Sequence, residues 1–282
     1  MIPSVGKAHY VKSHGLGNDY IVIDPRDVPF PITREAVQLI CDRHLGVGSD
    51  GILLVTESGG ADFGVRIYNP DGSEAEKSGN GIRIFAKYLR EHGYTNRDHF
   101  TVDTPGGRIA VQLALARGRV TEVTADMGTV TFDNLESIDV GRQRYAVTSL
   151  SIGNPHCVVI VHDLAAADVH NVGPLIESHP KFPAKTNVQF AQVLSRTHIG
   201  IEIWERGAGY TLASGTSSCA AAAAAHRKGL VDRSVTVTMP GGDLEVTVGE
   251  GYAMRLRGPV EEVTSGDFSP DLLRALVRRN AP

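Results

Sequence analysis

The sequence predicts a strand-rich α+β protein, mainly because turn-forming residues separate many short β-branched runs. The chain has 282 residues, 41% of them hydrophobic, with 31 glycines and 14 prolines. Runs of this kind indicate strands joined by tight turns, and they occupy residues 20–24, 51–55, 157–161 and 234–239. At about 150 residues per domain, the length indicates two domains.

Few segments have a helical pattern. We expect helices over residues 34–44, 81–91, 219–228 and 270–279. The last has Ser269 as its N-cap and Pro270 at its first helical position, which both favour a helix start. No low-complexity linker separates the halves, and the turn-rich stretch 126–134 is the expected crossing point between domains.

Charge and cysteine content narrow the classes of function. The net charge is -4, from 28 basic and 32 acidic residues, and no basic stripe indicates a nucleic-acid partner. Cys41, Cys157 and Cys219 form no CxxC pair, so neither a disulfide framework nor a metal site is expected. No apolar run is long enough to span a membrane, and no basic-then-apolar leader follows Met1. We expect a cytoplasmic protein with a small-molecule partner and no membrane partner.

An internal repeat is the strongest single feature. Residues 78–81 (SGNG) precede one apolar helix, and residues 214–217 (SGTS) precede the alanine-rich helix. In each, a small polar residue lies in a glycine-containing turn before a helix, where backbone N–H groups and the positive end of the helix dipole gather. Two such turns facing each other across an interdomain cleft could hold a carboxylate and place one side chain on either face of its α-carbon.

The motifs around these turns resemble diaminopimelate epimerases over nearly the whole chain. They occur in the order of that family: HGLGNDY at 14–20, RHLGVGSDG at 43–51, NPDGSEAE at 69–76 with SGNG at 78–81, GNPHC at 153–157, TNV at 186–188 and WERGAG at 204–209. The resemblance implies two pseudo-symmetric domains, each a curved sheet wrapped on a central helix, with the active site between them. We expect domains at 1–127 and 128–266, with 267–282 returning to the first.

The resemblance also implies a chemistry. Family members interconvert LL- and meso-diaminopimelate without pyridoxal phosphate or a metal, so no cofactor is expected, and they are commonly homodimers. One cysteine acts as a thiolate base and another as a thiol acid on opposite faces of the α-carbon. The site must also stabilise the carboxylate more strongly in the transition state than in the ground state.

Both cysteine positions hold serine in this chain, at Ser78 and Ser214. A hydroxyl ionises less readily than a thiol, so the thiolate mechanism cannot be carried over unchanged. His156 is a candidate general base for Ser78, and the alternative is that His156 only braces the site by hydrogen bonding. Cys157 and Cys219 are expected to be buried and inert.

The substrate-binding positions of the family are largely kept. They supply amide, carboxylate and guanidinium groups suited to a zwitterion with a second carboxylate, which Arg206 would bind. The candidates are Asn18, Asn69, Gly79, Asn80, Asn154, Asn187, Glu205, Arg206, Gly215 and Thr216. Gly51 replaces the usual glutamine and Tyr210 the usual glutamate, both at positions expected to flank the pocket.

Three explanations of the serine pair remain open. The chain is a family epimerase whose proton transfer runs slowly or differently. It is a same-fold isomerase that acts on a more acidic C–H bond, for which a weaker base suffices. Or it is a non-catalytic amino-acid-binding protein, natural or a Cys→Ser variant that traps substrate.

Overall fold

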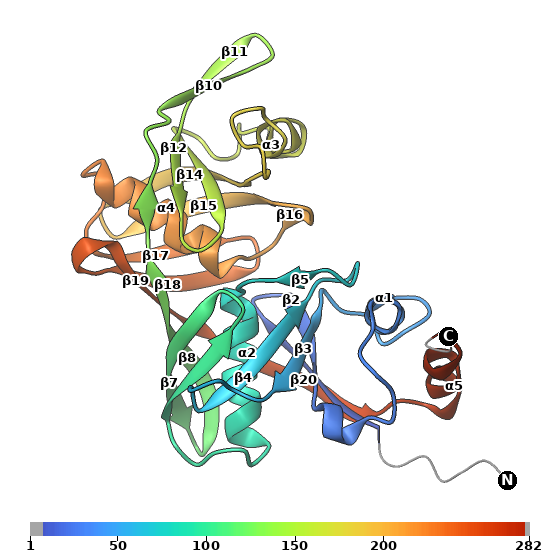
Figure 1. Ribbon diagram of the computed structural model, residues 1–282. Coiled ribbons are helices and arrows are strands. Elements are labelled where there is room, and N and C mark those ends of the chain that lie inside the picture. The colour runs from blue at the N-terminus through green and yellow to red at the C-terminus, as the bar shows by residue number, and fades with distance from the viewer. Residues whose placement is uncertain (1–7, 280–282) are drawn as a thin grey trace, which may run out of the picture. The chain divides into compact units, whose positions relative to one another are not determined.

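The computed structural model describes residues 8–279, and the absence of a leader after Met1 concerns residues outside this range. The chain divides into two compact units (Figure 1). Unit 1 comprises Met1–Gly15, Asp19–Val123 and Val260–Pro282, and unit 2 comprises Leu16–Asn18 and Thr124–Pro259. The two units divide between Val123 and Thr124, inside a continuous strand, β8 (Arg119–Thr129), just before the stretch 126–134. Its alternating burial keeps this segment extended through Met127.

Unit 1 is a mixed sheet with three helices. Its strands are β1 (His9–Gly15), β2 (Asn18–Ile23), β3 (Ile52–Thr56), β4 (Phe63–Tyr68), β5 (Glu74–Ala75), β6 (His99–Thr104), β7 (Gly107–Ala116) and β20 (Glu261–Asp267). Its helices are α1 (Arg34–Cys41), α2 (Gly79–Glu91) and α5 (Pro270–Arg279), with a 3-10 turn at Pro25–Asp27. Helix α2 contacts β1 and β7 and buries nearly its whole length.

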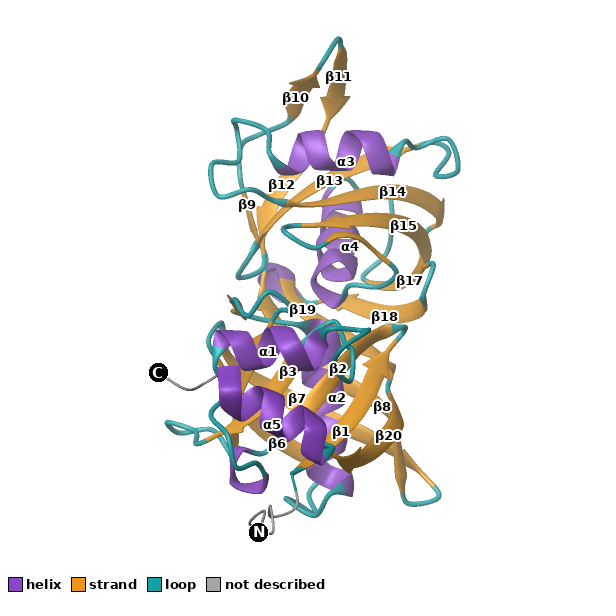
Figure 2. Cartoon of the chain, turned by 90° about the vertical axis from the view of Figure 1, so that its right-hand side faces the viewer, coloured by secondary structure: helices purple, strands orange, loops and turns teal. Residues whose placement is uncertain are grey.

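Unit 2 is likewise a sheet with helices packed against it. Its strands are β9 (Thr131–Phe132), β10 (Ser137–Val140), β11 (Gln143–Ala146), β12 (Thr148–Ser151), β13 (Pro155–Val161), β14 (Asn187–Ser195), β15 (His198–Glu205), β16 (Gly209–Thr211), β17 (Ser234–Met239), β18 (Gly242–Val248) and β19 (Ala253–Pro259). Its helices are α3 (Val169–Glu177) and α4 (Gly215–Arg227), with a 3-10 turn at Glu250–Tyr252. The sheet curves around α4, which contacts β12 to β15 and β17 to β19 (Figure 2).

The two units repeat one topology. In unit 1, β2 and β3 are parallel, β3 and β4 antiparallel, β4 and β6 parallel, and β6 and β7 antiparallel. In unit 2, β13, β14, β15, β17 and β18 repeat these four relations in the same order. Short strands β5 and β16 each form a hairpin just before the central helix of their unit. The pseudo-symmetry that the resemblance implied is therefore present in the strand order of each unit.

Strand registers identify equivalent residues in the two units. Ile21 pairs with Ile52, which pairs with Tyr68. Cys157 pairs with Val188, which pairs with Trp204. One residue earlier in the first two strands and one later in the antiparallel third, the sets Tyr20, Gly51, Asn69 and His156, Asn187, Glu205 therefore occupy equivalent positions.

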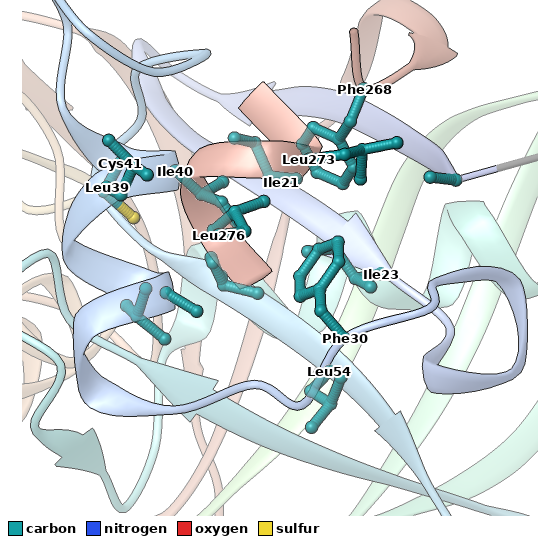
Figure 3. Packing of buried hydrophobic residues seen from close by; sticks show 14 residues of the cluster. Ile21, Ile23, Phe30, Leu39, Ile40, Cys41, Leu54, Phe268, Leu273 and Leu276 are labelled. Carbon is teal, nitrogen blue, oxygen red and sulfur yellow. The ribbon is translucent and has the colours of Figure 1, made fainter. Parts of the chain in front are cut away.

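The C-terminal helix completes the core of unit 1. Phe268, Leu273 and Leu276 pack with Ile21, Ile23 and Phe30, as Figure 3 shows. Helix α5 begins at Pro270, and the Ser269 hydroxyl accepts the Leu272 N–H at 3.2 Å, which confirms the expected cap. Phe268 also stacks on Tyr10, with ring centroids 4.9 Å apart. This apolar cluster fixes β2, the strand that carries part of the site.

The helix predictions need three corrections. Helix α1 ends at Cys41 and not at residue 44, because the backbone at Asp42 is extended. Helices α2 and α4 begin at Gly79 and Gly215, earlier than expected, because Ser78 and Ser214 cap them. Helix α3 was not predicted, since Gly173 and Pro174 within it disfavour a helix. A Cβ at Gly173 would lie 2.8 Å from Trp204 Cβ, so the glycine allows α3 to pack closely on β15. No helix within residues 8–279 is long and apolar enough to cross a membrane.

Candidate functional site

Ser78 lies at the start of α2 in unit 1. Its backbone is extended, with φ -139 and ψ 120, and its Oγ accepts the Gly81 N–H at 3.0 Å. Gly79 and Asn80 form the first turn of the helix, where N–H groups have no intrahelical partner. The turn therefore combines a half-buried hydroxyl with the donors that an anion needs.

Tyr20 is the side chain that meets Ser78. Its phenol oxygen lies 3.2 Å from Ser78 Oγ, and either oxygen can donate. The Tyr20 ring lies over Gly51, where an added Cβ would be 2.7 Å from the ring atom Cε1 and 2.4 Å from the Tyr68 carbonyl oxygen. Gly51, which departs from the family pattern, therefore leaves the space that Tyr20 occupies.

Arg83 supports the same turn from within α2. The side chain is fully buried, and its guanidinium donates to the Gly79 carbonyl oxygen at 3.1 Å and to Asn80 Oδ1 at 2.9 Å. Gly15, from the first motif, approaches closely, since an added Cβ would lie 2.8 Å from Arg83 Nη2. Asn80 is thus held inward by an arginine that the sequence motifs did not indicate.

Ser214 occupies the matching place in unit 2. Its backbone has φ -147 and ψ 123, and its Oγ accepts the Ser217 N–H at 3.5 Å, a longer bond than that of Ser78. Gly215 and Thr216 form the first turn of α4, and both are buried. The Ser214 N–H contacts Met239 Sδ at 3.4 Å. Within residues 8–279, the Ser214 hydroxyl has no hydrogen bond to an ionisable side chain.

His156 is fully buried on β13, and both of its ring nitrogens are engaged. Nε2 lies 3.0 Å from Asn154 Oδ1, and the Gln189 amide donates to Nδ1 at 3.1 Å. Burial lowers the pKa of His156 to about 3. The hydrogen bond with Gln189 acts in the opposite direction, and the positive charge of Arg206 lowers the pKa further. The imidazole stays neutral with no vacant nitrogen, which argues against the expected Ser78–His156 pair.

Gln189 connects His156 to the start of α4. Its amide nitrogen also donates to Ser217 Oγ at 3.0 Å. The Ser217 N–H in turn donates to the Oγ of the capping residue, Ser214. Gln189 itself is fully buried on β14. His156 therefore reaches Ser214 only through Gln189 and Ser217, and Gln189 is a connecting residue that the sequence motifs missed.

The turn after β15 carries Glu205 and Arg206, and neighbouring side chains hold its backbone. Asn187 Oδ1 accepts the Arg206 N–H at 3.0 Å, while Asn187 Nδ2 donates to the Pro155 carbonyl at 2.8 Å. This places Asn154, Asn187 and Arg206 in one connected group within unit 2.

Glu177 fastens the other side of this turn. Its carboxylate, 7% exposed, accepts the Trp204 indole N–H at 2.9 Å, the Gly207 N–H at 3.0 Å and the Lys185 ammonium at 3.2 Å. Burial alone would raise the pKa of Glu177, but these bonds outweigh it and lower the pKa. Glu177 lies on α3, the helix missed in the sequence, so nothing there indicated its role.

Asn69 and Asn18 lie at the ends of strands. Asn69 follows β4, and its amide donates to Ser73 Oγ at 3.0 Å within the NPDGS turn. Asn18 opens β2 and is grouped with unit 2, where an added Cβ at the preceding Gly17 would contact Leu212 at 3.5 Å. Both asparagines therefore sit in defined backbone turns.

Tyr210 lies on the short strand β16 and packs toward α3. Its hydroxyl donates to Glu202 at 2.6 Å and its ring lies 4.5 Å from that of His170 on α3. Tyr210 pairs with Trp204 across the hairpin, so both side chains stand on the strand face that α3 covers. The residue thus supports α3 packing.

The cysteines are buried and free, as expected for Cys157 and Cys219. Burial raises the pKa of Cys157 to about 12 and, despite a hydrogen bond from Ser49, raises that of Cys41 to about 11. Neither thiol is suited to form a thiolate near neutral pH. Among residues 8–279, no group of His, Cys, Asp or Glu side chains could hold a metal ion.

Sequence comparisons agree with these motifs. The family described as diaminopimelate epimerase matches residues 10–132 and 148–261. The chain is 44% identical over 277 residues to diaminopimelate epimerase 2 of a Nostoc species, covering 93% of this chain and 96% of that protein. It is 43% identical over 280 residues to the diaminopimelate epimerase of Pelotomaculum thermopropionicum, covering 92% and 98% of the two chains.

Solved structures show the same fold at low identity. A probable proline racemase from Agrobacterium radiobacter matches with a TM-score of 0.75 at 17% identity, covering 93% of each chain. A hydroxyproline epimerase from Agrobacterium vitis matches with a TM-score of 0.73 at 15% identity, covering 94% of this chain and 93% of the other. The relatives, the family match and the repeated fold agree, and this chain belongs to the diaminopimelate epimerase family.

Proposed function

We propose that this protein epimerises the α-carbon of diaminopimelate, with Ser78 and Ser214 as the acid and base groups. The observation that carries the proposal is the repeated turn. Each serine caps a central helix with nearly the same backbone angles, at the positions where the family has its catalytic cysteines. Inversion requires one group on either face of the carbon, and a duplicated turn supplies one group per unit. As in the family, the proposed reaction uses neither pyridoxal phosphate nor a metal.

The recognition residues support the same substrate. In the proposal, the first-turn N–H groups of Gly79, Asn80, Gly215 and Thr216 stabilise the reacting carboxylate, whose negative charge grows as the proton leaves. Arg206 binds the distal carboxylate in bidentate fashion. Asn18, Asn69, Asn154, Asn187 and Glu205 bind the amino and carboxylate groups. His156 braces this group through Asn154 and Gln189 instead of accepting a proton.

Proton exchange in deuterated water tests the proposal. Incubation with LL-diaminopimelate should give deuterium at the α-carbon together with the meso isomer, both followed by NMR and chiral chromatography. The Ser78→Cys/Ser214→Cys double variant should be faster by at least about 100-fold, because thiols ionise near neutral pH. Ser218→Cys adds a thiol one turn inside α4 and is the matched control, with no gain expected.

Two results would count against the proposal. Binding of diaminopimelate without exchange, in both the wild type and the double variant, would leave an amino-acid-binding protein. Absence of binding, measured by calorimetry, would favour an isomerase of another acid. We also propose that the protein is a homodimer, as family members commonly are, which analytical ultracentrifugation of the same preparations tests. A cytoplasmic location is proposed as well, and cell fractionation tests it.

A further inference from the structure

The pair of Tyr20 and Ser78 is unlike anything around Ser214. Tyr20 is 7% exposed, and its hydroxyl lies 3.2 Å from Ser78 Oγ. Ser78 Oγ already accepts the Gly81 N–H at 3.0 Å, so its remaining hydrogen-bonding capacity is directed at the phenol. The phenol is thus the one ionisable group bonded to the Ser78 hydroxyl within residues 8–279.

Gly51 holds this arrangement in place. Its carbonyl oxygen accepts the Ile21 N–H at 3.0 Å and the Ser49 hydroxyl at 2.9 Å, which fixes the backbone beside the ring. Any side chain at position 51 would collide with the Tyr20 ring and with the Tyr68 carbonyl. Gly51 and Tyr20 are therefore a matched pair, in which the missing side chain makes room for the phenol.

The internal repeat gives Tyr20 a counterpart. By strand register, Tyr20 stands where His156 stands in unit 2, next to the equivalent asparagines Asn18 and Asn154. His156 is three hydrogen bonds away from the cap residue Ser214, through Gln189 and Ser217. Tyr20 meets its cap serine directly. The position at which His156 only braces unit 2 is thus occupied by the phenol of Tyr20 in unit 1.

We propose that Tyr20 is a positioning residue that relays the proton of Ser78, an inference that rests on the proposed epimerase function. In the abstraction direction, the Cα–H bond breaks and its electron pair stays on the carbon. The proton bonds to Ser78 Oγ, while the original Ser78 proton moves to the Tyr20 phenolate. Ser78 ends as a hydroxyl and Tyr20 as a phenol, and the negative charge has passed from the phenolate to the carbanion. Protonation of the carbanion is the reverse.

The relay addresses the weakness of serine as an acid or base. Without a partner, proton abstraction by Ser78 requires an alkoxide, which forms with great difficulty in water. With the relay, the ionising group is a phenol, whose ordinary pKa is about 10. General acid–base groups typically contribute about 10²- to 10⁴-fold to a rate, and the phenol makes such a contribution reachable at the Ser78 face.

A double-mutant cycle between Tyr20→Phe and Ser78→Cys tests the relay. Tyr20→Phe removes one oxygen and keeps the ring over Gly51. In the Ser78 background it should lower kcat for α-proton exchange about 100-fold with little change in KM. In the Ser78→Cys background the loss should be less than about threefold, because a thiol ionises by itself.

Tyr10→Phe is the matched control. Tyr10 lies in the same unit, stacked on Phe268, and its loss of a hydroxyl should leave exchange unchanged. Equal losses in both backgrounds would show that the hydroxyl acts through packing, which overturns the relay while leaving the epimerase intact. No loss in the Ser78 background would also overturn the relay. Absence of exchange by the wild type and by the Ser78→Cys/Ser214→Cys variant would overturn the proposed function and the relay together.

Discussion

The turns at Ser78 and Ser214 have the same backbone and different chemistry. Their φ angles are -139 and -147 and their ψ angles 120 and 123, and each serine caps the helix with its Oγ. Ser78, however, contacts a phenol, while Ser214 is 4% exposed beside Met239 and the serines of its own helix. The two units therefore repeat the position of the proposed acid or base group, while the side chains around it differ.

The central helices α2 and α4 also differ in the residues that surround their first turns. Five residues after its cap serine, α2 buries Arg83, whose guanidinium returns to the first turn, whereas α4 has Cys219 at that place. Helix α4 continues as a run of fully buried alanines, which lets strands approach it closely on several sides. Unit 1 thus places charge near its turn, and unit 2 has tight apolar packing there. A duplicated site becomes asymmetric through its neighbours.

The largest expected effect concerns this asymmetry. Ser214→Cys should raise exchange about 100-fold, whereas Ser78→Cys should raise it about tenfold, because Ser78 already has the phenol as a proton partner. The measurement is α-deuterium incorporation by each single variant, starting from both the LL and the meso isomer. Ser218→Cys again serves as the control for an added thiol in α4. Equal gains at the two positions would contradict the asymmetry.

Local patterns predicted much of each turn. Serine followed by glycine before an apolar run indicated both turns, although not that Ser78 and Ser214 are the helix caps, and the motifs indicated the asparagines and Arg206. Helix α3 was not predicted because Gly173 and Pro174 disfavour a helix. The repeat nevertheless offered a signal, since parallel strands need a crossover connection. Helix α1 forms this crossover between β2 and β3, and α3 forms the equivalent one between β13 and β14.

Contacts that depend on strand register were beyond reach of the sequence. The meeting of Tyr20 with Ser78 requires the pairing of β2 with β3 and the open space at Gly51. The neutral, doubly bonded state of His156 depends on Gln189 reaching it from the next strand. Such pairings are set by the whole sheet, so they cannot be read from the spacing of residues along the chain.

The loops that carry the recognition residues are fastened differently in the two units. In unit 2, the buried Glu177 carboxylate holds the Arg206 turn, and Glu177→Gln should destabilise the protein by about 3 kcal/mol, because an amide cannot accept all three donors. In unit 1, the Asp50 carboxylate accepts the Asp19 N–H at 3.1 Å and the Arg43 guanidinium at 2.7 Å, and its side chain is 40% exposed. Asp50→Asn should therefore cost less, about 1 kcal/mol. Urea unfolding measures the free energy of unfolding of both variants. Equal losses of stability would show that the two carboxylates stabilise their loops to the same extent.

The Glu177 prediction has a pH signature and an optical one. Because its folded-state pKa is lowered, Glu177 stabilises the fold fully above its unfolded pKa of about 4.3 and loses this contribution as the pH falls through the folded value. Glu177→Gln should therefore weaken the loss of stability below about pH 4. Trp204, the one tryptophan of the chain, should change its fluorescence in the variant, since Glu177 accepts its indole N–H. An unchanged acid profile would contradict this assignment.

A smaller loss of stability than that of Glu177→Gln tests the space that distinguishes unit 1. Gly51→Ala adds a Cβ 2.4 Å from the Tyr68 carbonyl and 2.7 Å from the Tyr20 ring, so backbone or ring must move, at a cost of about 2 kcal/mol. Gly59→Ala is the matched control, since no atom lies within 4 Å of its added Cβ. Thermal unfolding should separate the two variants. Since the displaced ring carries the phenol away from Ser78, Gly51→Ala should also lose exchange activity, whereas the equivalent position in unit 2 holds the side chain of Asn187.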